Sequence, residues 1–287
     1  MNEEQQSPGR IQWFIQLPLV RIIIATLWLS IPLTIVQELL RLLPVTDKDI
    51  RAIILVGPVI LTAYFAYLSY VRFIEKRRMS ELDFKGFLGE LLKGILVGFL
   101  LFSLTIGIMW SFGYYTITGY NDWTVLLPML SLALIAGFFE EVFFRGVIFR
   151  ITEESLGTWI ALVISALIFG LLHIFNPNAT LFAALAIALE AGILLGAAYV
   201  LTRRLWFAIG IHLAWNFTQG GIYGVSVSGT EAKGILQSQL SGPAILSGGE
   251  FGAEASIFAL VIATSAGVYF VWQAHKKGNF IKPFWKR

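Results

Sequence analysis

The chain has 287 residues, of which 57% are hydrophobic and 14% charged, and its mean hydropathy of +0.75 is too high for an ordinary soluble domain. The net charge of +3 is too small to indicate a nucleic-acid partner. The absence of cysteine excludes a disulfide framework, a thiol nucleophile and thiolate metal ligands.

Apolar stretches recur along the whole chain, and eight of them are long enough to cross a hydrocarbon core of about 30 Å. They cover residues 20–43, 52–71, 94–114, 123–144, 159–175, 179–202, 206–221 and 255–274. The sequence therefore predicts an all-α, polytopic integral membrane protein with about eight transmembrane helices. No internal repeat or second domain is evident, so residues 1–287 are expected to form a single membrane domain.

The basic residues set the predicted orientation, because cytoplasmic flanks carry an excess of Lys and Arg. With eight spans and a cytoplasmic N-terminus, only Arg41, Lys48, Arg51 and Lys233 of the 21 basic residues fall outside. Both termini are therefore predicted to be cytoplasmic. The first 20 residues lack the pattern of a cleaved signal peptide, so the first span is expected to be retained. Residues 222–254, rich in Gly and Ser, are expected to form a mobile extracytoplasmic loop.

The sixth apolar stretch carries small residues at four-residue spacing, namely Ala184, Ala188, Gly192 and Gly196. This stripe favours close packing of another helix over a binding groove. Glu190 lies in the same stretch and is a further ionisable group within the membrane. It could line a cavity or bond a neighbouring helix, and the structural role is favoured.

Two adjacent carboxylates, Glu140 and Glu141, interrupt the fourth apolar stretch together with Arg145. A charged side chain near the bilayer centre costs roughly 2.5 to 3.5 kcal/mol on insertion scales, so this group needs a reason to be there. The two glutamates lie about 100° apart around a helix, and Arg145 has the favourable i,i+4 spacing from Glu141. The spacing predicts a paired Glu141 and a free Glu140. Alternatively, both glutamates serve only to pair with Arg145 or a neighbouring helix.

Two histidines lie within spans. Glu140 precedes the connection near Gly157 by 17 residues and His173 follows it by 16, so a helical hairpin places both roughly 25 Å from the turn. His212 and Asn216 share a face of the seventh stretch, and His212 lies on the order of 10 Å below the cytoplasmic surface. The hairpin reaches that level only if residues 145–154 project into the cytosol. Three helices are then expected to converge on one site near the cytoplasmic side.

These residue types suit hydrolysis of an amide by activated water. A carboxylate beside a histidine can take a proton from water and pass it to a leaving group, while His and Asn can donate hydrogen bonds to an oxyanion. One Glu and two His are also a common zinc set. The sequence has no His-Glu-x-x-His, however, and convergence from three helices specifies no metal geometry, so a metal site is the less favoured alternative. No cofactor is expected.

In these residues the chain resembles the type II CAAX prenyl endopeptidases, the Ras-converting protease family, and the broader group of abortive-infection and bacteriocin-processing membrane proteins. The resemblance rests on three ordered motifs within residues 140–216: Glu140-Glu141-x-x-x-Arg145, Phe169-x-x-x-His173 and His212-x-x-x-Asn216. It implies an eight-helix intramembrane endopeptidase that hydrolyses the peptide bond after a prenylated cysteine and releases the C-terminal tripeptide.

The resemblance also implies a role for each motif residue. Glu140 and His173 would activate the water, His212 and Asn216 would hold the oxyanion, and Glu141 and Arg145 would support the site. It further implies a glutamate-type, metal-independent peptidase. Its partners would be a prenylated CAAX protein or peptide and membrane lipid. The convergence of the three helices near the cytoplasmic side predicts an active site that faces the cytosol.

Two functions from other classes fit parts of the pattern. A proton-coupled transporter could use Glu140, His173 and Glu190 as a relay, although the inverted repeats common in such proteins are not evident here. A non-catalytic, bacteriocin-immunity-like membrane protein would need the helix packing but not the carboxylates.

Overall fold

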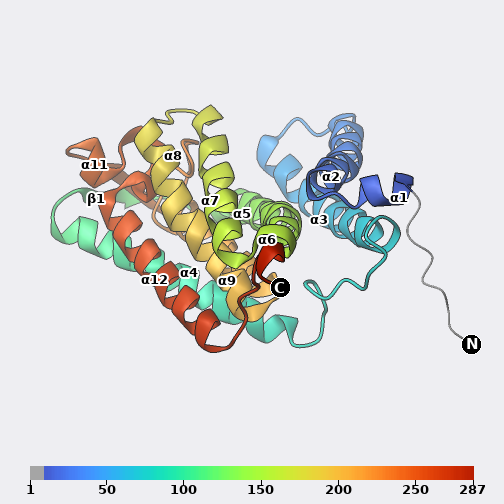
Figure 1. Cartoon of the computed structure of the whole chain (residues 1–287). Coiled ribbons are helices and arrows are strands. Elements are labelled where there is room, and N and C mark those ends of the chain that lie inside the picture. The colour runs from blue at the N-terminus through green and yellow to red at the C-terminus, as the bar shows by residue number, and fades with distance from the viewer. Residues whose placement is uncertain (1–9) are drawn as a thin grey trace, which may run out of the picture.

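The computed structural model describes residues 10–287, and nearly all of its regular structure is helical (Figure 1). The predicted position of the N-terminus itself lies outside the described residues. Seven helices in this part are long and apolar enough to cross a membrane: α2 (Pro18–Arg41), α3 (Lys48–Phe73), α4 (Phe87–Ser111), three composite helices (Trp123–Leu156, Thr158–Phe175 and Leu181–Thr202) and α12 (Ile257–Lys276). A shorter apolar helix covers Trp206–Ile222. The prediction of an all-α membrane protein with about eight spans is confirmed.

The composite helices change their hydrogen-bonding pattern along their length. The first contains η1 (Trp123–Val125), α5 (Leu126–Glu141), η2 (Val142–Phe149) and α6 (Arg150–Leu156); the second contains α7 (Thr158–Leu172) and η3 (His173–Phe175); the third contains α8 (Leu181–Ile187), η4 (Ala188–Gly192) and α9 (Ile193–Thr202). The shorter helix contains α10 (Trp206–Asn216) and η5 (Phe217–Ile222). Elements η2, η4 and η5 are π-helical.

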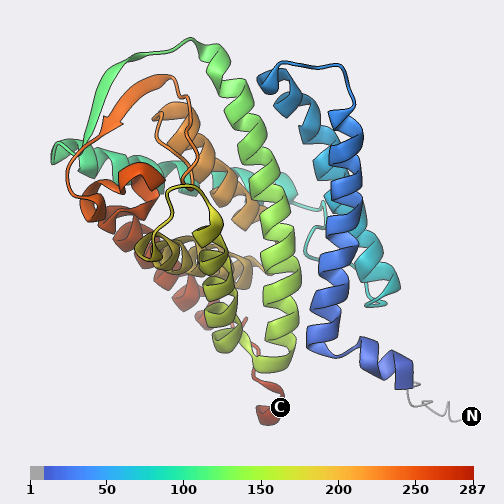
Figure 2. The same cartoon turned by 90° about the horizontal axis from the view of Figure 1, so that it is seen from above.

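Helices α2 and α3 form a pair on one side of the molecule, and they join the rest along the helix that contains α5 and α6 (Figures 1 and 2). Short polar side chains cap the N-termini of several helices by accepting hydrogen bonds from the free backbone N–H groups of the first turn. Asp47 caps α3, Thr180 caps α8 and Ser256 caps α12. The hairpin between α6 and α7 turns at Gly157, whose φ of +80° is accessible to glycine at no steric cost.

The small-residue stripe packs against α7, as predicted. A Cβ atom on Gly192 would lie 2.7 Å from the Cα of Ala166, and one on Gly170 would lie 2.5 Å from the Cβ of Ala188. Contacts this short leave no room for larger side chains at these positions. Helices α7 and α8–η4 are therefore in close contact along this stripe.

The segment expected to be a mobile loop contains regular structure. Within residues 222–254 lie β2 (Leu236–Leu240), α11 (Ala244–Ser247), η6 (Gly249–Phe251) and η7 (Ala253–Ala255). Strand β2 pairs antiparallel with β1 (Tyr115–Tyr120), with an irregularity between Ile117 and Gly119. The sequence did not indicate this pairing, because the strand partner lies more than 100 residues earlier. The extracytoplasmic position of the segment stays a prediction.

The segments predicted to be cytoplasmic meet at one end of the bundle. Arg21 donates to Glu154 over 2.7 Å and also pairs with Glu75, which accepts from Arg150 over 2.6 Å. Arg203 pairs with Glu153 at 2.5 Å. These ion pairs link α2, the connection after α3, α6 and the turn after α9.

Residues 145–154 are helical and largely buried within the protein, rather than an exposed polar turn. The helix continues to Leu156, and Arg145, Arg150 and Glu153 are at most 6% exposed. Each of these charges has a partner that helps to offset the cost of burial. For Arg150 and Glu153 those partners lie on elements distant in the sequence. The extension of this hairpin end into the cytosol stays a prediction.

Candidate functional site

Three π-helical segments adjoin the polar residues of the membrane interior. Segment η2 begins directly after Glu141, η4 contains Glu190, and η5 begins directly after Asn216. A π-helical turn contains an extra residue, which changes the direction of the following side chains, and such turns are frequent at functional sites. The polar residues therefore lie where the helices depart from regular α-helical geometry.

Glu141 and Arg145 form a fully buried ion pair on the helix of α5 and η2. Arg145 Nη1 donates to Glu141 Oε1 over 2.7 Å, and both side chains are 0% exposed. Arg145 Nη2 also donates to the backbone carbonyls of Ala191, at 3.0 Å, and Gly192, at 3.4 Å. The i,i+4 pairing expected from the sequence is therefore present, and it ties the helix to η4.

His212 on α10 lies between the two glutamates. Its Nδ1 is 2.9 Å from Glu141 Oε1, and its Nε2 is 3.9 Å from Glu140 Oε2. Because a carboxylate can only accept a hydrogen bond, the contact with Glu141 assigns a proton to Nδ1. This leaves Nε2 directed toward Glu140.

The two glutamates differ in accessibility. The Glu140 side chain is 28% exposed, whereas that of Glu141 is completely buried. Glu141 Oε1 already accepts from both Arg145 and His212. Glu140 is therefore the carboxylate that can contact water or a ligand, and Glu141 is the one that orients the imidazole.

His173 lies at the end of α7 and is partly exposed. Its Nδ1 is 2.7 Å from the carbonyl oxygen of Phe169 and so donates to it, and its Nε2 forms no hydrogen bond with residues 10–287. The Phe169 ring lies 4.8 Å from the ring of His173 and 6.2 Å from that of His212, and the Arg145 guanidinium lies 4.6 Å from the same ring. Phe169 thus connects the second motif to the other two by packing.

The convergence expected from the sequence is present for some of the residues. The structure joins Glu140, Glu141, Arg145 and His212 directly, and it places His173 nearby through Phe169. Between described residues, no hydrogen bond or ion pair links His173 to Glu140. Asn216 is partly exposed one turn beyond His212, and its side chain forms no hydrogen bond with the described part of the chain.

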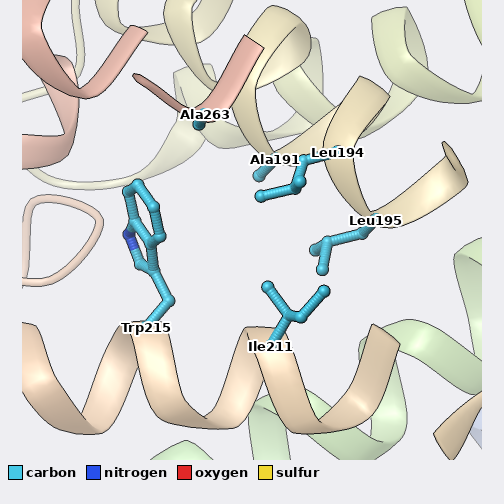
Figure 3. A pocket seen from close by; sticks show the side chains of 6 residues that line it. All are labelled: Ala191, Leu194, Leu195, Ile211, Trp215 and Ala263. Carbon is cyan, nitrogen blue, oxygen red and sulfur yellow. The ribbon is translucent and has the colours of Figure 1, made fainter. Parts of the chain in front are cut away.

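The face of α10 that carries Ile211 and Trp215, about 100° around the helix from His212 and Asn216, is apolar. Ile211 and Trp215 point toward Leu194, Leu195, Ala191 and Ala263 across a cavity of about 20 Å³ (Figure 3). No side chain that lines this cavity can donate to or accept from a bound water, apart from the Trp215 indole N–H. The polar chemistry of α10 is therefore confined to the face of His212 and Asn216.

A second group of polar residues, Gln219 and Glu254, was missed by the sequence reasoning. Gln219 is fully buried and its Nε2 donates to the Ser226 carbonyl over 2.5 Å, while Glu254 is 3% exposed and accepts from the Ser228 N–H. Glu190 is 1% exposed and forms no ion pair with any described residue. Gln219 follows His212 by seven residues, so a search for polar residues at helical spacing could have found it.

Burial raises the pKa of the Glu254 carboxyl to about 7 from an ordinary value of 4.5, although hydrogen bonds from Ser228 and Gln219 oppose the shift. The native state then binds this proton more tightly than the unfolded chain. Below pH 4.5 this group contributes about 3 kcal/mol to the free energy of unfolding. The contribution is lost as the pH rises from 4.5 to about 7.

Glu254→Gln should remove this pH dependence while keeping an acceptor for the Ser228 N–H. We expect the unfolding temperature of the variant to exceed that of the unsubstituted protein at pH 8 and to approach it at pH 5. Glu250→Gln, at an exposed position on the same segment, is the matched control. Parallel curves of unfolding temperature against pH for the protein and Glu254→Gln would contradict this assignment.

No group of three or more His, Asp and Glu side chains within residues 10–287 is placed to hold one metal ion. The nearest approach to such a group is Glu140, Glu141 and His212. In this set Glu141 is already bonded to Arg145 and to the Nδ1 atom of His212.

Comparison with known families matches residues 122–218 to the family described as type II CAAX prenyl endopeptidase Rce1-like. The matched segment begins beside Trp123 and contains all three motifs, so the resemblance seen in the sequence is confirmed over these residues. No curated protein matches the chain. The family supports a membrane protease of the CAAX type.

Proposed function

We propose that this chain, which carries an Rce1-like domain at residues 122–218, is an endopeptidase that hydrolyses the peptide bond after a prenylated cysteine and releases the C-terminal tripeptide. The observation that carries the proposal is the accessible carboxylate of Glu140 beside His212, whose imidazole is oriented by a buried Glu141–Arg145 pair. Such an arrangement suits proton transfer to and from an attacking water.

In the proposed mechanism, Glu140 and His173 activate the water. Glu140 takes a proton from the water as it attacks the scissile carbonyl, and then delivers that proton to the leaving amine. His173 assists through its free Nε2, because its Nδ1 is held by the Phe169 carbonyl. Both side chains are partly exposed, which is consistent with contact with water and substrate.

His212 and Asn216 would stabilise the tetrahedral intermediate. For His212 Nε2 to donate to the oxyanion the ring must carry both protons, and carboxylates on either side of the ring stabilise that charged form. Asn216 lies one turn along the same face and has amide N–H groups free to donate. Glu141 and Arg145 act through His212 and are positioning residues.

We further propose that the site opens to the cytosol and that both termini lie on that side. The ion pairs at one end of the bundle support this orientation, because they gather the basic flanks of several spans. The C-terminal tail lies at the same end: Ile281 exchanges hydrogen bonds with Thr158 beside the hairpin turn.

The proposal is tested by incubating the detergent-purified protein with a farnesylated CAAX peptide and, in parallel, with the same peptide lacking the farnesyl group. We expect release of the C-terminal tripeptide, detected by mass spectrometry, from the farnesylated peptide alone. Equal release from both peptides would contradict the prenyl specificity, and release from neither would contradict the proposed activity.

A further inference from the structure

An apolar groove runs along the outside of the bundle between α3, α5 and α10. It has a volume of about 470 Å³ and is lined only by apolar and aromatic side chains, including Leu61 from α3, Phe138 from α5 and Leu213 from α10. Leu61 is 57% exposed, so the groove opens toward the surface that faces lipid. Its shape and lining suit a hydrocarbon chain.

The apolar groove continues into a basic groove of about 610 Å³ at the charged end of the bundle. Tyr64 and Phe84 line both grooves, so the two form one continuous surface. The charged residues that line the basic groove are Arg72, Lys76, Arg77, Arg78 and Asp83. Positive charge therefore predominates at one end of this continuous groove, and the other end carries no charge.

Three of the four cations are available to a ligand. Arg77 is neutralised by the buried Glu75 and Glu81, at 2.7 and 2.5 Å. Within the described residues Arg72 and Lys76 form no ion pair, and the exposed Arg78 has only a 3.3 Å contact with Asp83. An anion in this groove would satisfy charges that the protein leaves unpaired.

Aromatic side chains mark the boundary between the two grooves. The ring of Phe84 lies 5.6 Å from that of Tyr64 and 5.7 Å from that of Trp206. Tyr and Trp concentrate at the level of lipid headgroups, where their apolar bodies and polar tips both find partners. The order along the groove is therefore apolar, aromatic and then basic, which matches the order of acyl chain, glycerol and phosphate in a phospholipid.

The connection between α3 and α4, which forms one wall of the basic groove, is held in place. The Glu81 backbone carbonyl accepts a hydrogen bond from the Leu205 N–H over 2.9 Å, and the Asp83 carbonyl accepts one from the Trp206 indole N–H over 3.0 Å. Burial alone would raise the pKa of the Glu81 carboxyl. The hydrogen bonds and positive charge of Arg77 outweigh the effect of burial and lower the pKa to about 2. Glu81 thus stays ionised at neutral pH, and the groove is formed before any ligand arrives.

We propose that this continuous groove binds one anionic phospholipid, with an acyl chain in the apolar part and the phosphate beside Arg72, Lys76 and Arg78. Charge complementarity supports a phospholipid with net negative charge over a zwitterionic one, because the three free cations face one acidic side chain. This site is distinct from Glu140 and His212, and the inference stands whether or not the chain is a peptidase.

The test measures binding of phosphatidylglycerol and phosphatidylcholine to the full-length, delipidated protein by native mass spectrometry. We expect one phosphatidylglycerol to bind saturably and more tightly than phosphatidylcholine. Each basic side chain near an anionic surface contributes roughly a fivefold effect, so Arg72→Ala/Lys76→Ala/Arg78→Ala should weaken this binding on the order of 100-fold. The matched control is Lys277→Ala/Lys282→Ala/Lys286→Ala, in which exposed cations at the same end are removed and binding should persist.

A second pair of variants examines the apolar part. Leu61→Trp should fill the groove and weaken phosphatidylglycerol binding, whereas Leu96→Trp, at an equally exposed position outside the groove, should not. Equal losses in the two triple variants would overturn the proposal in favour of diffuse electrostatic attraction. Displacement of the phospholipid by an equimolar farnesylated peptide would also overturn it, because the groove would then belong to the substrate.

Discussion

Glu140→Gln is expected to lower the turnover of a farnesylated CAAX peptide by about 10²–10⁴-fold, the range typical of a lost general base. The amide keeps the shape of the carboxylate but cannot take a proton from water. KM should change little, because Glu140 acts on the water and on the leaving group rather than on the bound prenyl chain. Since the side chain is partly exposed, the unfolding temperature should stay close to that of the unsubstituted protein.

The matched control is Glu90→Gln on α4. The Glu90 side chain is 27% exposed, nearly the same as the 28% of Glu140, and it contacts Arg204 rather than His212. Glu90→Gln should therefore retain normal turnover. Turnover by Glu140→Gln at the rate of the unsubstituted protein would remove Glu140 from the mechanism.

Arg145→Met is expected to destabilise the protein by about 3–5 kcal/mol, because it leaves the carboxylate of Glu141 buried without its cation. The substitution also removes the donor to the Ala191 and Gly192 carbonyls, which joins η2 to η4. Activity should fall as well, since Glu141 would no longer hold His212 in a fixed orientation. The measurement is the free energy of unfolding in detergent, combined with kcat at a temperature where the variant remains folded.

The double variant Glu141→Gln/Arg145→Met separates stability from positioning. Without the buried charge it should recover most of the lost stability, yet kcat should remain low because His212 Nδ1 has lost its carboxylate acceptor. Arg41→Met, which breaks the exposed pair with Glu38, should cost less than about 1 kcal/mol. A double variant no more stable than Arg145→Met would show that the buried ion pair is not the source of the effect.

Local helical periodicity accounts for what could be predicted from the sequence. The spans, the turn at Gly157 and the pairing of Glu141 with Arg145 all depend on residues close together in the chain, for which 3.6 residues per turn fixes the geometry. The close packing of Gly192 on α7 was predictable for the same reason, because small residues at four-residue spacing share one face.

Contacts between distant segments account for what could not be predicted. The sequence contains no information on which nitrogen of His212 faces Glu141, since that depends on how α10 packs against α5. The connection of His173 to the site through the Phe169 ring depends on side-chain packing rather than on depth alone. Likewise, nothing local to residues 145–154 indicates that Arg150 is buried against Glu75.

Cleavage of a farnesylated CAAX peptide after exhaustive chelation is the most direct test of water activation by Glu140 and the histidines. We expect tripeptide release to continue at an unchanged rate in a strong chelator and to disappear in Glu140→Gln assayed alongside. Loss of cleavage in the chelator, followed by recovery on addition of zinc, would contradict this mechanism and make the same carboxylate and histidines metal ligands.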